Sequence, residues 1–370
     1  MELARIPLRR MAWRLAEGID STLLVLILAL SMLGLAALFS ATYENPARLV
    51  NQAVNLGFAL VALWLVAQVP PQTIMRCAVP AYALGLALLL AVALFGDVVN
   101  GARRWLNVGV TRFQPAEIMK LALPLMLAWV FHKNESTLRL RDFAAGVVLL
   151  AVPVALIARQ PDLGTAALVA AVGVYVIFFA GISWKVLGAL AGLGLAALPL
   201  AWGFLHDYQR KRILTLLDPT QDPLGAGYHI IQSTIAVGSG GITGKGWLNG
   251  TQAHLEFIPE RHTDFIFAVY SEEFGLIGNL ALLALYALLV ARGLMIAANA
   301  ATAFARLLAG AIALMFFTYA FVNMGMVSGI LPVVGVPLPF LSYGGSSLLT
   351  LFIGTGMLMS IQRHRKLVQT

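Results

Sequence analysis

The chain has few charged residues and a single cysteine, and both shortages exclude whole classes of protein. Only 11% of its 370 residues are Asp, Glu, Lys or Arg, whereas 60% are hydrophobic. A water-soluble protein of this size needs far more polar surface to cover its core. Cys77 is alone, so no disulfide within the chain cross-links its loops. The net charge is +8, but the basic residues lie between apolar runs, which indicates a membrane protein and no nucleic-acid partner.

Ten apolar runs have the length of about twenty residues that is needed to cross the hydrocarbon layer of a membrane. The first starts near Ser21 and is too long for the core of a cleaved signal peptide, so we expect it to be retained. The predicted fold class is an all-α polytopic membrane protein, with one domain over residues 1–370. The expected spans are residues 21–40, 50–69, 77–96, 117–132, 143–158, 163–181, 184–205, 264–291, 303–327 and 343–361.

One long polar segment, residues 206–263, separates the seventh span from the eighth. Its length and its content of glycine, proline and charge are typical of a functional loop. Residues 238–247 resemble a phosphate-binding loop, but they lack the Walker spacing and a preceding strand, so we expect a flexible turn. The histidines at 229, 254 and 262 have no metal-ligand spacing, which argues against a zinc site.

The basic residues predict the orientation of the chain. With the N-terminus inside, fourteen Lys and Arg residues fall in cytoplasmic segments and ten in external ones. Five of those ten lie in the long loop, which the positive-inside rule discounts. The short loops therefore favour a cytoplasmic N-terminus. An even number of spans returns the C-terminus to the cytoplasm and places residues 206–263 outside.

Glu117 and Lys120 are ionisable residues inside the fourth span. They are three residues apart, which places them on one face of a helix and close enough to pair. An acid at a helix start also suits the helix dipole, so the pair can be merely self-neutralising. Ionisable residues within a span are equally candidates for function, and these two lie near the external surface.

Asp264 is the strongest functional candidate. It lies where the long loop meets an apolar helix, beside Arg261 and His262. The free-energy cost of removing its charge from water must be offset by other interactions. Asp264 can instead be only the N-cap of the eighth helix, as Asp162 can be of the sixth. Ser342 follows a proline-rich break at the same surface, and broken backbone at a membrane edge usually lines a cavity.

Several basic residues on the external side are candidates for binding a phosphate group. Arg103 and Arg112 precede the fourth span, and Arg210, Lys211 and Arg212 follow the seventh. Snorkelling to lipid phosphates explains such a cluster equally well. The alternative is electrostatic capture of the phosphate of a substrate.

Motifs along nearly the whole chain resemble the SEDS family of bacteria. The family motifs are residues 112–120 (RFQPAEIMK), 160–165 (QPDLGT), 222–233 (DPLGAGYHIIQS) and 262–268 (HTDFIFA). Residues 244–252 (GKGWLNGTQ) and 259–262 (PERH) look like the RodA branch of the family rather than the FtsW branch. Ala116 stands where the family usually has Ser, which is a small exchange.

The resemblance implies a peptidoglycan glycosyltransferase of cell elongation, which polymerises lipid II at the external face of the bacterial cytoplasmic membrane. It also implies a class B penicillin-binding transpeptidase, other elongation-complex membrane proteins and membrane lipid as partners. With that chemistry, Asp264 is expected to be the general base or a metal-binding carboxylate, and the reaction is expected to invert the anomeric carbon. Glu117 and Lys120 are expected to join it in catalysis.

The remaining expectations concern substrate and cofactor. The substrate-binding residues expected are Arg103, Arg112, Asp162, Arg210, Lys211, Arg212, Arg261, His262 and Ser342. A divalent cation, Mg²⁺ or Mn²⁺, bound by Asp264 or Glu117, can share the stabilisation of the leaving diphosphate, although no metal-specific pattern is present.

A flippase for lipid-linked precursors remains the alternative, because ten spans and a polar cavity would suit it equally and it also needs cationic groups for a diphosphate. A translocation path should place polar groups at mid-depth and show an inverted repeat. The candidate residues lie at the external edge instead, and no repeat is visible. A scaffold protein would not need Glu117 and Lys120 inside a span.

Overall fold

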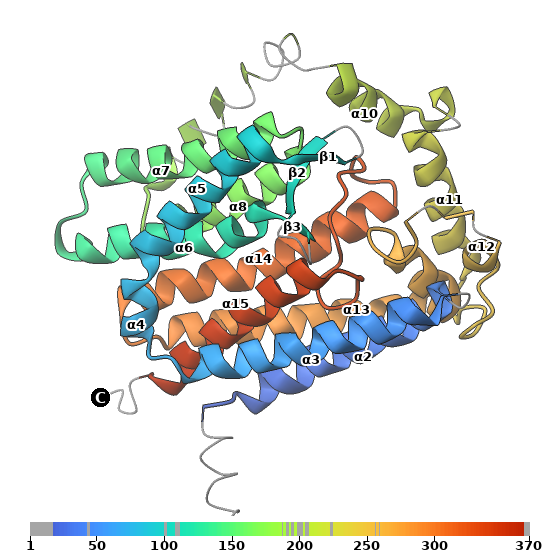
Figure 1. Ribbon diagram of the computed structural model, residues 1–370, viewed down its shortest axis with the longest axis horizontal. Coiled ribbons are helices and arrows are strands. Elements are labelled where there is room, and N and C mark those ends of the chain that lie inside the picture. The colour runs from blue at the N-terminus through green and yellow to red at the C-terminus, as the bar shows by residue number, and fades with distance from the viewer. Residues whose placement is uncertain are drawn as a thin grey trace, which may run out of the picture.

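The structure is a computed structural model that describes residues 18–365 except 43–44, 100–101, 108–111, 187, 190–191, 194–195, 198–202, 204–206, 223–224, 256 and 259. Long helices lie side by side in a bundle (Figure 1). The predicted all-α polytopic fold is confirmed, because seven helices of the described part are long and apolar enough to cross a membrane. They are α2 (Ser21–Ala41), α3 (Pro46–Gln68), α5 (Ala78–Phe95), α7 (Leu140–Arg159), α13 (Ile266–Ala298), α14 (Ala303–Val327) and α15 (Gly345–Arg363).

Three other helices belong to the expected spans or their edges. Helix α6 (Pro115–Lys133) carries charged groups in its first turns, and α8 (Leu163–Phe179) is apolar but only 17 residues long. The short α4 (Pro71–Arg76) precedes α5. Nine of the ten expected spans thus coincide with a helix. The expected seventh span, residues 184–205, falls largely outside the described residues.

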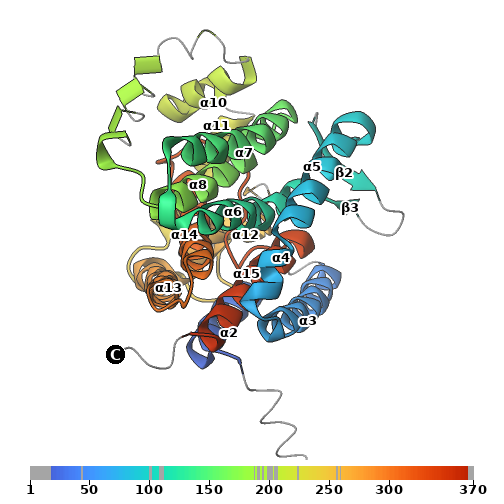
Figure 2. The same ribbon diagram turned by 90° about the vertical axis from the view of Figure 1, so that its left-hand side faces the viewer.

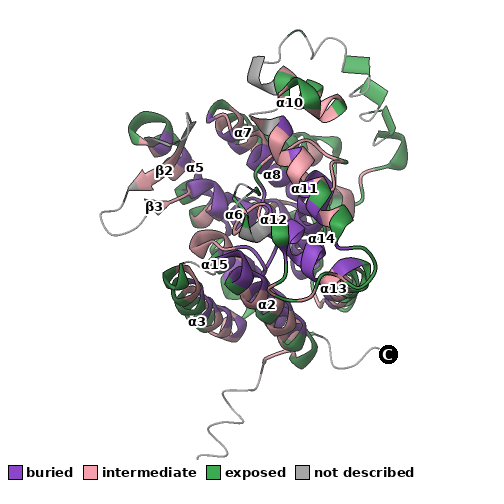
Figure 3. Ribbon diagram, turned by 90° about the vertical axis from the view of Figure 1, so that its right-hand side faces the viewer, coloured by how far each residue is buried: buried purple, intermediate pink, exposed green. Residues whose placement is uncertain are grey.

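Helix α14 forms the centre of the bundle. It is buried over most of its length and packs against α13, α8 and α6 (Figures 2 and 3). The outer helices expose large apolar side chains such as Phe58 and Leu94. In water such side chains would form an aggregation-prone surface, but in a membrane they face hydrocarbon chains. The core therefore lies around α14, and the apolar perimeter matches the lipid.

A small antiparallel sheet, which the sequence did not predict, connects α5 to α6. Its strands β1 (Asp97–Val99), β2 (Ala102–Asn107) and β3 (Arg112–Phe113) lie in that order, with Leu106 paired to Phe113. Strand β2 contacts both α5 and α6. The sheet therefore holds β2 against the start of α6.

The two ends of the described chain meet at one end of the bundle. A Cβ atom added to Gly18 would lie 2.8 Å from Cδ of Arg363, at the end of α15. Asp20 caps α2 by accepting from the N–H of Leu23 (2.8 Å), and it pairs with Arg292 near the end of α13. The chain therefore crosses the bundle an even number of times between Gly18 and Arg363. The basic residues at 5, 9, 10 and 14 lie outside the described residues.

The long polar segment lies at the opposite end of the bundle (Figure 1) and is largely helical. It contains α10 (Asp207–Leu217), the 3-10 helix η2 (Pro219–Gln221), α11 (Ala226–Ser239) and α12 (Thr251–His254). Its turn at residues 240–246 is not the flexible turn that we expected from the sequence. The side chain of Lys245 binds Glu272 (Nζ to Oε1, 2.6 Å), and the N–H of Gly246 donates to Glu273 (3.0 Å).

Helix α13 is broken at Gly275, and the turn at residues 240–246 fills the break. Gly275 has φ +64°, which interrupts the helical hydrogen bonds. The amides freed by the break donate to the turn instead: Leu276 to Gly241 (2.9 Å) and Ile277 to Ile242 (3.1 Å). Residues 276–298 are long enough by themselves to cross the hydrocarbon layer, which takes about 20 residues. Residues 266–274 form a separate buried helical piece.

Replacing Gly275 with alanine is expected to destabilise the protein. The left-handed conformation costs a non-glycine residue about 1–3 kcal/mol, and the new Cβ would lie 2.2 Å from the backbone N of Gly244. Gly57→Ala is the matched control, because that lipid-facing glycine of α3 has open space around its Cβ position. Thermal unfolding in detergent should show a lower midpoint for Gly275→Ala only. Equal midpoints for the two variants would contradict this explanation of the break.

Candidate functional site

A polar cavity of about 380 Å³ lies near the starts of α6 and α8. Its walls come from the sheet, from both of these helices, from the loop before α13 and from the loop before α15. The ionisable side chains that line it are Arg104, Glu117, Lys120, Asp162, Glu260 and Asp264. Ionisable residues as far apart in the sequence as Arg104 and Asp264 thus share one cavity, which lies at one end of an apolar bundle.

Glu117 and Lys120 form a buried ion pair on α6, as their spacing predicted. Lys120 Nζ lies 2.6 Å from Glu117 Oε1, and it also lies over the ring of Tyr319 on α14. The Lys120 side chain is only 3% exposed, so its charge depends on this carboxylate. Glu117 Oε2 is buried without a hydrogen-bond partner in the described part of the structure. This oxygen, on a residue that lines the cavity, is available to accept from a bound molecule.

Asp162 caps α8, as its place in the sequence suggested, and it also lines the cavity. Its Oδ1 accepts from the N–H of Thr165 (3.2 Å) and caps α8, while its Oδ2 accepts from Gln114 Nε2 (3.0 Å). Arg104 Nε lies 3.9 Å from the same Oδ2, and Arg104 also donates to the carbonyl of Pro161 (3.1 Å). Asp162 therefore connects the sheet, the start of α6 and the start of α8 around one wall of the cavity.

Asp264 does not cap α13. That helix begins at Ile266 with Phe265 as its N-cap, and Asp264 lines the cavity instead. Its backbone carbonyl accepts from the fully buried Asn323 of α14 (2.8 Å). A Cβ on Gly335 would lie 3.3 Å from Asp264 Oδ2, and Gly335 has φ +73°. A glycine at 335 therefore suits the turn and leaves space beside the carboxylate.

Burial raises the pKa of Asp264 to about 6. The negative charge of Glu260 adds to this rise, and the positive charge of Arg104 opposes it. A carboxylate with this pKa is ionised at neutral pH and is a stronger base than an ordinary aspartate. These are the properties that a general base requires.

Ser342 holds the loop of Asp264 in place. Its hydroxyl donates to the carbonyl of Thr263 (2.7 Å) and accepts from the N–H of Leu338 (2.7 Å). The N–H of Tyr343 donates to the carbonyl of His262 (3.0 Å). Because the Ser342 hydroxyl is buried and occupied in this way, we assign it a positioning role in place of the expected contact with substrate.

Arg261 and His262 also lie beside the cavity rather than in its described wall. Arg261 Nε donates to the carbonyl of Ala41 at the end of α2 (2.7 Å). His262 Nδ1 lies 3.3 Å from an Arg48 nitrogen. Burial and the Arg48 charge lower the pKa of His262, which favours the neutral ring, while the charge of Glu260, 3.9 Å from Nε2, opposes this shift.

The other predicted basic residues divide into two groups. Arg210, Lys211 and Arg212 lie on α10, and the described wall of the cavity contains no residue of that helix. Arg210 instead donates to the carbonyl of Gly203 (2.9 Å). The side chains of Arg103 and Arg112 lie outside the described residues.

The structure adds cavity residues that we did not select from the sequence. Arg104 and Trp105 come from β2, and Gln114 comes from the turn before α6. A sheet between two spans was not predicted, so no pattern distinguished Arg104 from its neighbour. Glu260 also lines the cavity and has φ +48°, which is unusual for a residue with a side chain.

No three His, Cys, Asp or Glu side chains in the described ranges are close enough together to hold a metal ion. Mg²⁺, however, usually keeps several waters and binds proteins through one or two carboxylates together with substrate phosphates. The carboxylates of the cavity, Asp264 or Glu117, would therefore fit a cation that arrives with a phosphate-bearing substrate. They do not form a preformed metal cage.

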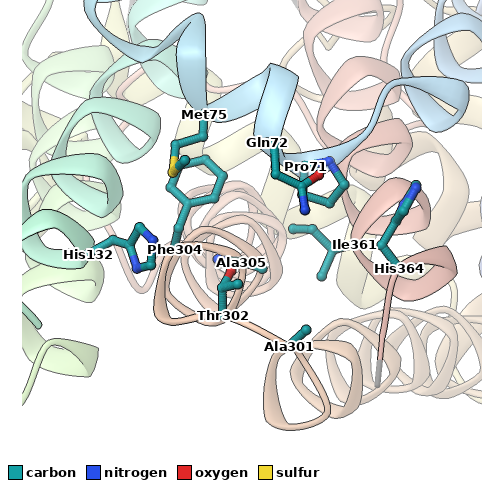
Figure 4. A pocket seen from close by; sticks show the side chains of 10 residues that line it. All are labelled: Pro71, Gln72, Met75, His132, Ala301, Thr302, Phe304, Ala305, Ile361 and His364. Carbon is teal, nitrogen blue, oxygen red and sulfur yellow. Dashed lines mark hydrogen bonds between the residues drawn. The ribbon is translucent and has the colours of Figure 1, made fainter. Parts of the chain in front are cut away.

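A second, smaller cavity of about 100 Å³ lies at the end of the bundle where the described termini meet (Figure 4). His132 and His364 line it from opposite sides. His132 Nδ1 is 3.4 Å from Glu135, and His364 Nδ1 is 2.9 Å from the carbonyl of Ser360. Both rings thus have contacts on their own helical segments, and the cavity lacks the carboxylates of the larger one.

Comparison with known proteins places this geometry in a family. The family model described as "Cell cycle protein", which covers FtsW, RodA and SpoVE, matches residues 20–367. The chain belongs to this family. It is 51% identical to the peptidoglycan glycosyltransferase MrdB of Escherichia coli K12, over 95% of each chain. It is 37% identical to the probable peptidoglycan glycosyltransferase FtsW of Trichlorobacter lovleyi, over 98% of this chain and 97% of the relative.

Solved structures agree with the sequence relatives. A chain of a complex described as "Structural coordination of polymerization and crosslinking by a peptidoglycan synthase complex" matches with a TM-score of 0.81 and 38% identity, over 94% of this chain and 99% of the other. RodA of Thermus thermophilus matches with a TM-score of 0.72 and 32% identity, over 94% and 97%. The predicted family, its RodA branch and the glycosyltransferase class are confirmed, and the chain is a multi-pass inner-membrane protein.

Three variants should separate the structural role of the Glu117–Lys120 pair from its role in activity. Glu117→Gln or Lys120→Met leaves one buried group unpaired, and the expected loss of stability is about 3–5 kcal/mol. The double variant Glu117→Gln/Lys120→Met removes both charges and is expected to recover much of that stability. Thermal unfolding and glycosyltransferase assays of all three variants test this. A folded but inactive double variant is the expected outcome. Full activity of the double variant would show that the pair serves only the packing of α6.

Proposed function

We propose that this glycosyltransferase polymerises lipid II into glycan strands at the external face of the cytoplasmic membrane during cell elongation. The observation that carries the proposal is a basic carboxylate, Asp264, in one cavity with Arg104 and the Glu117–Lys120 pair. The similarity to an Escherichia coli peptidoglycan glycosyltransferase over nearly the whole chain supports the substrate class.

Asp264 acts as the general base. It takes the proton from the acceptor sugar hydroxyl while that oxygen attacks the anomeric carbon of the donor, and the polyprenyl diphosphate leaves with the bonding electron pair. A positioned base of this kind contributes about 10²–10⁴-fold to the rate. One direct displacement inverts the anomeric carbon. The pKa of about 6 keeps Asp264 ionised at pH 7 and ready to accept the proton.

The positive groups of the cavity stabilise the leaving diphosphate. Arg104 is partly exposed on the cavity wall, and its guanidinium suits bidentate contacts with phosphate oxygens. Lys120 is held in place by Glu117 and by the ring of Tyr319. The unpartnered Glu117 Oε2 accepts a hydrogen bond from a substrate hydroxyl, which removes the cost of leaving this oxygen buried alone.

A divalent cation would be held by Asp264 together with the diphosphate oxygens of the substrate. It would neutralise negative charge as the leaving group departs. Mg²⁺ or Mn²⁺ suits such oxygen ligands. The residues of the chain supply the base and the fixed positive charges with or without it.

The charge distribution supports an external location of the cavity. The described ends of the chain meet at the end of the bundle opposite the long polar segment (Figure 1). Basic residues such as Arg292, Arg306 and Arg363 lie at that end, which the positive-inside rule places in the cytoplasm. Both termini are then cytoplasmic, and the cavity opens on the side where the cell wall is built.

The partner proposed is a class B penicillin-binding transpeptidase that crosslinks the new strands, within a larger assembly of elongation proteins. The solved complex that resembles this chain combines polymerisation with crosslinking, according to its description. An apolar groove of about 700 Å³ between α13 and α14 is open to the lipid and offers a surface on the perimeter of the bundle.

Asp264→Asn is expected to abolish polymerisation, because the amide keeps the size of the side chain but cannot accept the proton. The measurement is lipid II polymerisation by the purified chain with its transpeptidase partner, with Asp264→Ala in parallel and with unfolding midpoints and partner binding as controls. Full polymerisation by folded Asp264→Asn would show that Asp264 is not the general base. If the wild-type complex is intact but makes no polymer, the flippase becomes the better explanation.

The rate of polymerisation is expected to rise with pH through a midpoint of about 6, because only the ionised form of Asp264 accepts a proton. Glu260→Gln removes a neighbouring negative charge, so the pKa of Asp264 falls and the midpoint moves to lower pH. A pH series of single-turnover rates for both proteins tests this. An unchanged midpoint in Glu260→Gln would show that another group controls the rate.

A further inference from the structure

An apolar groove of about 480 Å³ runs along the outside of the bundle between α8 and α14. Its volume lies in the range of about 300–1,000 Å³ that is typical of ligand sites. Small residues of α8, Gly164, Ala167 and Ala171, form one wall, and Phe317 and Phe321 of α14 form the other. The two phenylalanines stack with ring centroids 5.7 Å apart and are about half exposed, so the groove is open to the hydrocarbon layer.

The inner end of the groove is tied together by a hydrogen bond. The hydroxyls of Tyr175 on α8 and Thr318 on α14 lie 2.7 Å apart. This contact joins the two helices at mid-depth and satisfies both hydroxyls in an apolar setting. The groove therefore has a defined inner end and continues from there toward the polar end of the bundle.

The outer end of the groove meets the catalytic cavity. Leu168 lines both spaces. Gly164 lines the groove and Thr165 the cavity, while across from them Val334 lines the groove and Gly335 the cavity. A Cβ on Gly164 would lie 2.6 Å from the carbonyl oxygen of Val334, so the two walls approach each other closely here. A polar compartment and an apolar compartment are thus contiguous at one short boundary.

We infer that the groove between α8 and α14 holds the isoprenoid units nearest the diphosphate of the polyprenyl-linked substrate, while the diphosphate and sugars occupy the catalytic cavity. The inference rests on the proposed function. An amphiphile with a charged head and an apolar tail matches both compartments at once. The groove between α13 and α14 is larger, but in the described part of the chain it shares no lining residue with the cavity of Asp264.

Dependence of the Michaelis constant on chain length tests the groove. Ala171→Trp fills the groove with a large side chain. Ala171 is partly exposed on α8, so the substitution is expected to leave the packing of the core intact. Ala155→Trp on the lipid-exposed face of α7 is the matched control, with the same substitution away from the groove. Each protein is assayed with lipid II that carries the full undecaprenyl chain and with a short analogue of two isoprene units.

The wild type should prefer the long chain, because every buried isoprene unit adds apolar contact. Ala171→Trp should raise the Michaelis constant for the long-chain substrate by about tenfold, the loss expected when about two buried methylene groups are displaced, and should reduce the preference for long chains. Ala155→Trp should keep the wild-type preference. Equal loss on both substrates, or an unchanged preference, would overturn the inference.

A photocrosslinking measurement separates this inference from the proposed function. Benzoylphenylalanine at position 171, in the otherwise wild-type complex, is irradiated with radiolabelled undecaprenyl diphosphate in phospholipid vesicles. A crosslink that unlabelled undecaprenyl diphosphate competes away, but added phospholipid does not, supports the polyprenyl chain in the groove even if no polymer forms. A crosslink to phospholipid only, no crosslink to undecaprenyl diphosphate at position 171, or an equally strong one from the control position 155 would assign the groove to bulk lipid and reject the inference.

Discussion

The buried ion pair of Glu117 and Lys120 is the interaction on which the functional end of the bundle depends. An isolated charge inside an apolar bundle is too costly to keep, but a lysine 2.6 Å from a carboxylate and over an aromatic ring is tolerated. The pair allows α6 to carry two charges while it packs against α8 and α14. Because Lys120 occupies only one oxygen of Glu117, the other is left for a bound molecule. The same pair thus brings two charges into an apolar wall and leaves one acceptor oxygen there without a partner in the described part of the structure.

Broken backbone surrounds this wall, and its polar groups find specific partners. Asn323 donates to the carbonyls of Asp264 and Val336, so one buried side chain of α14 holds both loops of the cavity. Ser342 connects the same two loops from the other side. The turn at residues 240–246 fills the break of α13 at Gly275. These hydrogen bonds hold the loop of Asp264 in place, and a catalytic carboxylate, the role proposed for Asp264, requires such a fixed position.

The position of the cavity suits a reaction between a membrane-bound donor and a product that leaves the membrane. Its charged groups lie at one end of the bundle, beside a segment rich in polar residues, and its boundary with the groove of α8 and α14 lies toward the lipid. An anionic diphosphate therefore need not enter the apolar core. Burial in the cavity also raises the pKa of Asp264, so under the proposed function the environment that would admit a lipid-linked substrate also makes this carboxylate a stronger base.

The sequence by itself determined the class of the protein, most of its helices and the proximity of Glu117 and Lys120. Runs of apolar residues require helices in lipid, since only a helix satisfies its own backbone there, and the i, i+3 spacing of Glu117 and Lys120 requires their proximity. The tertiary structure alone decided which residues share the cavity. Arg104 lines the cavity because a sheet that the sequence did not predict carries it there, whereas no residue of α10 lies in the described wall. Ser342 supports the loop of Asp264 through its hydrogen bond to Thr263. Such choices depend on contacts between distant segments, and no local pattern of residues encodes the direction in which a loop folds back.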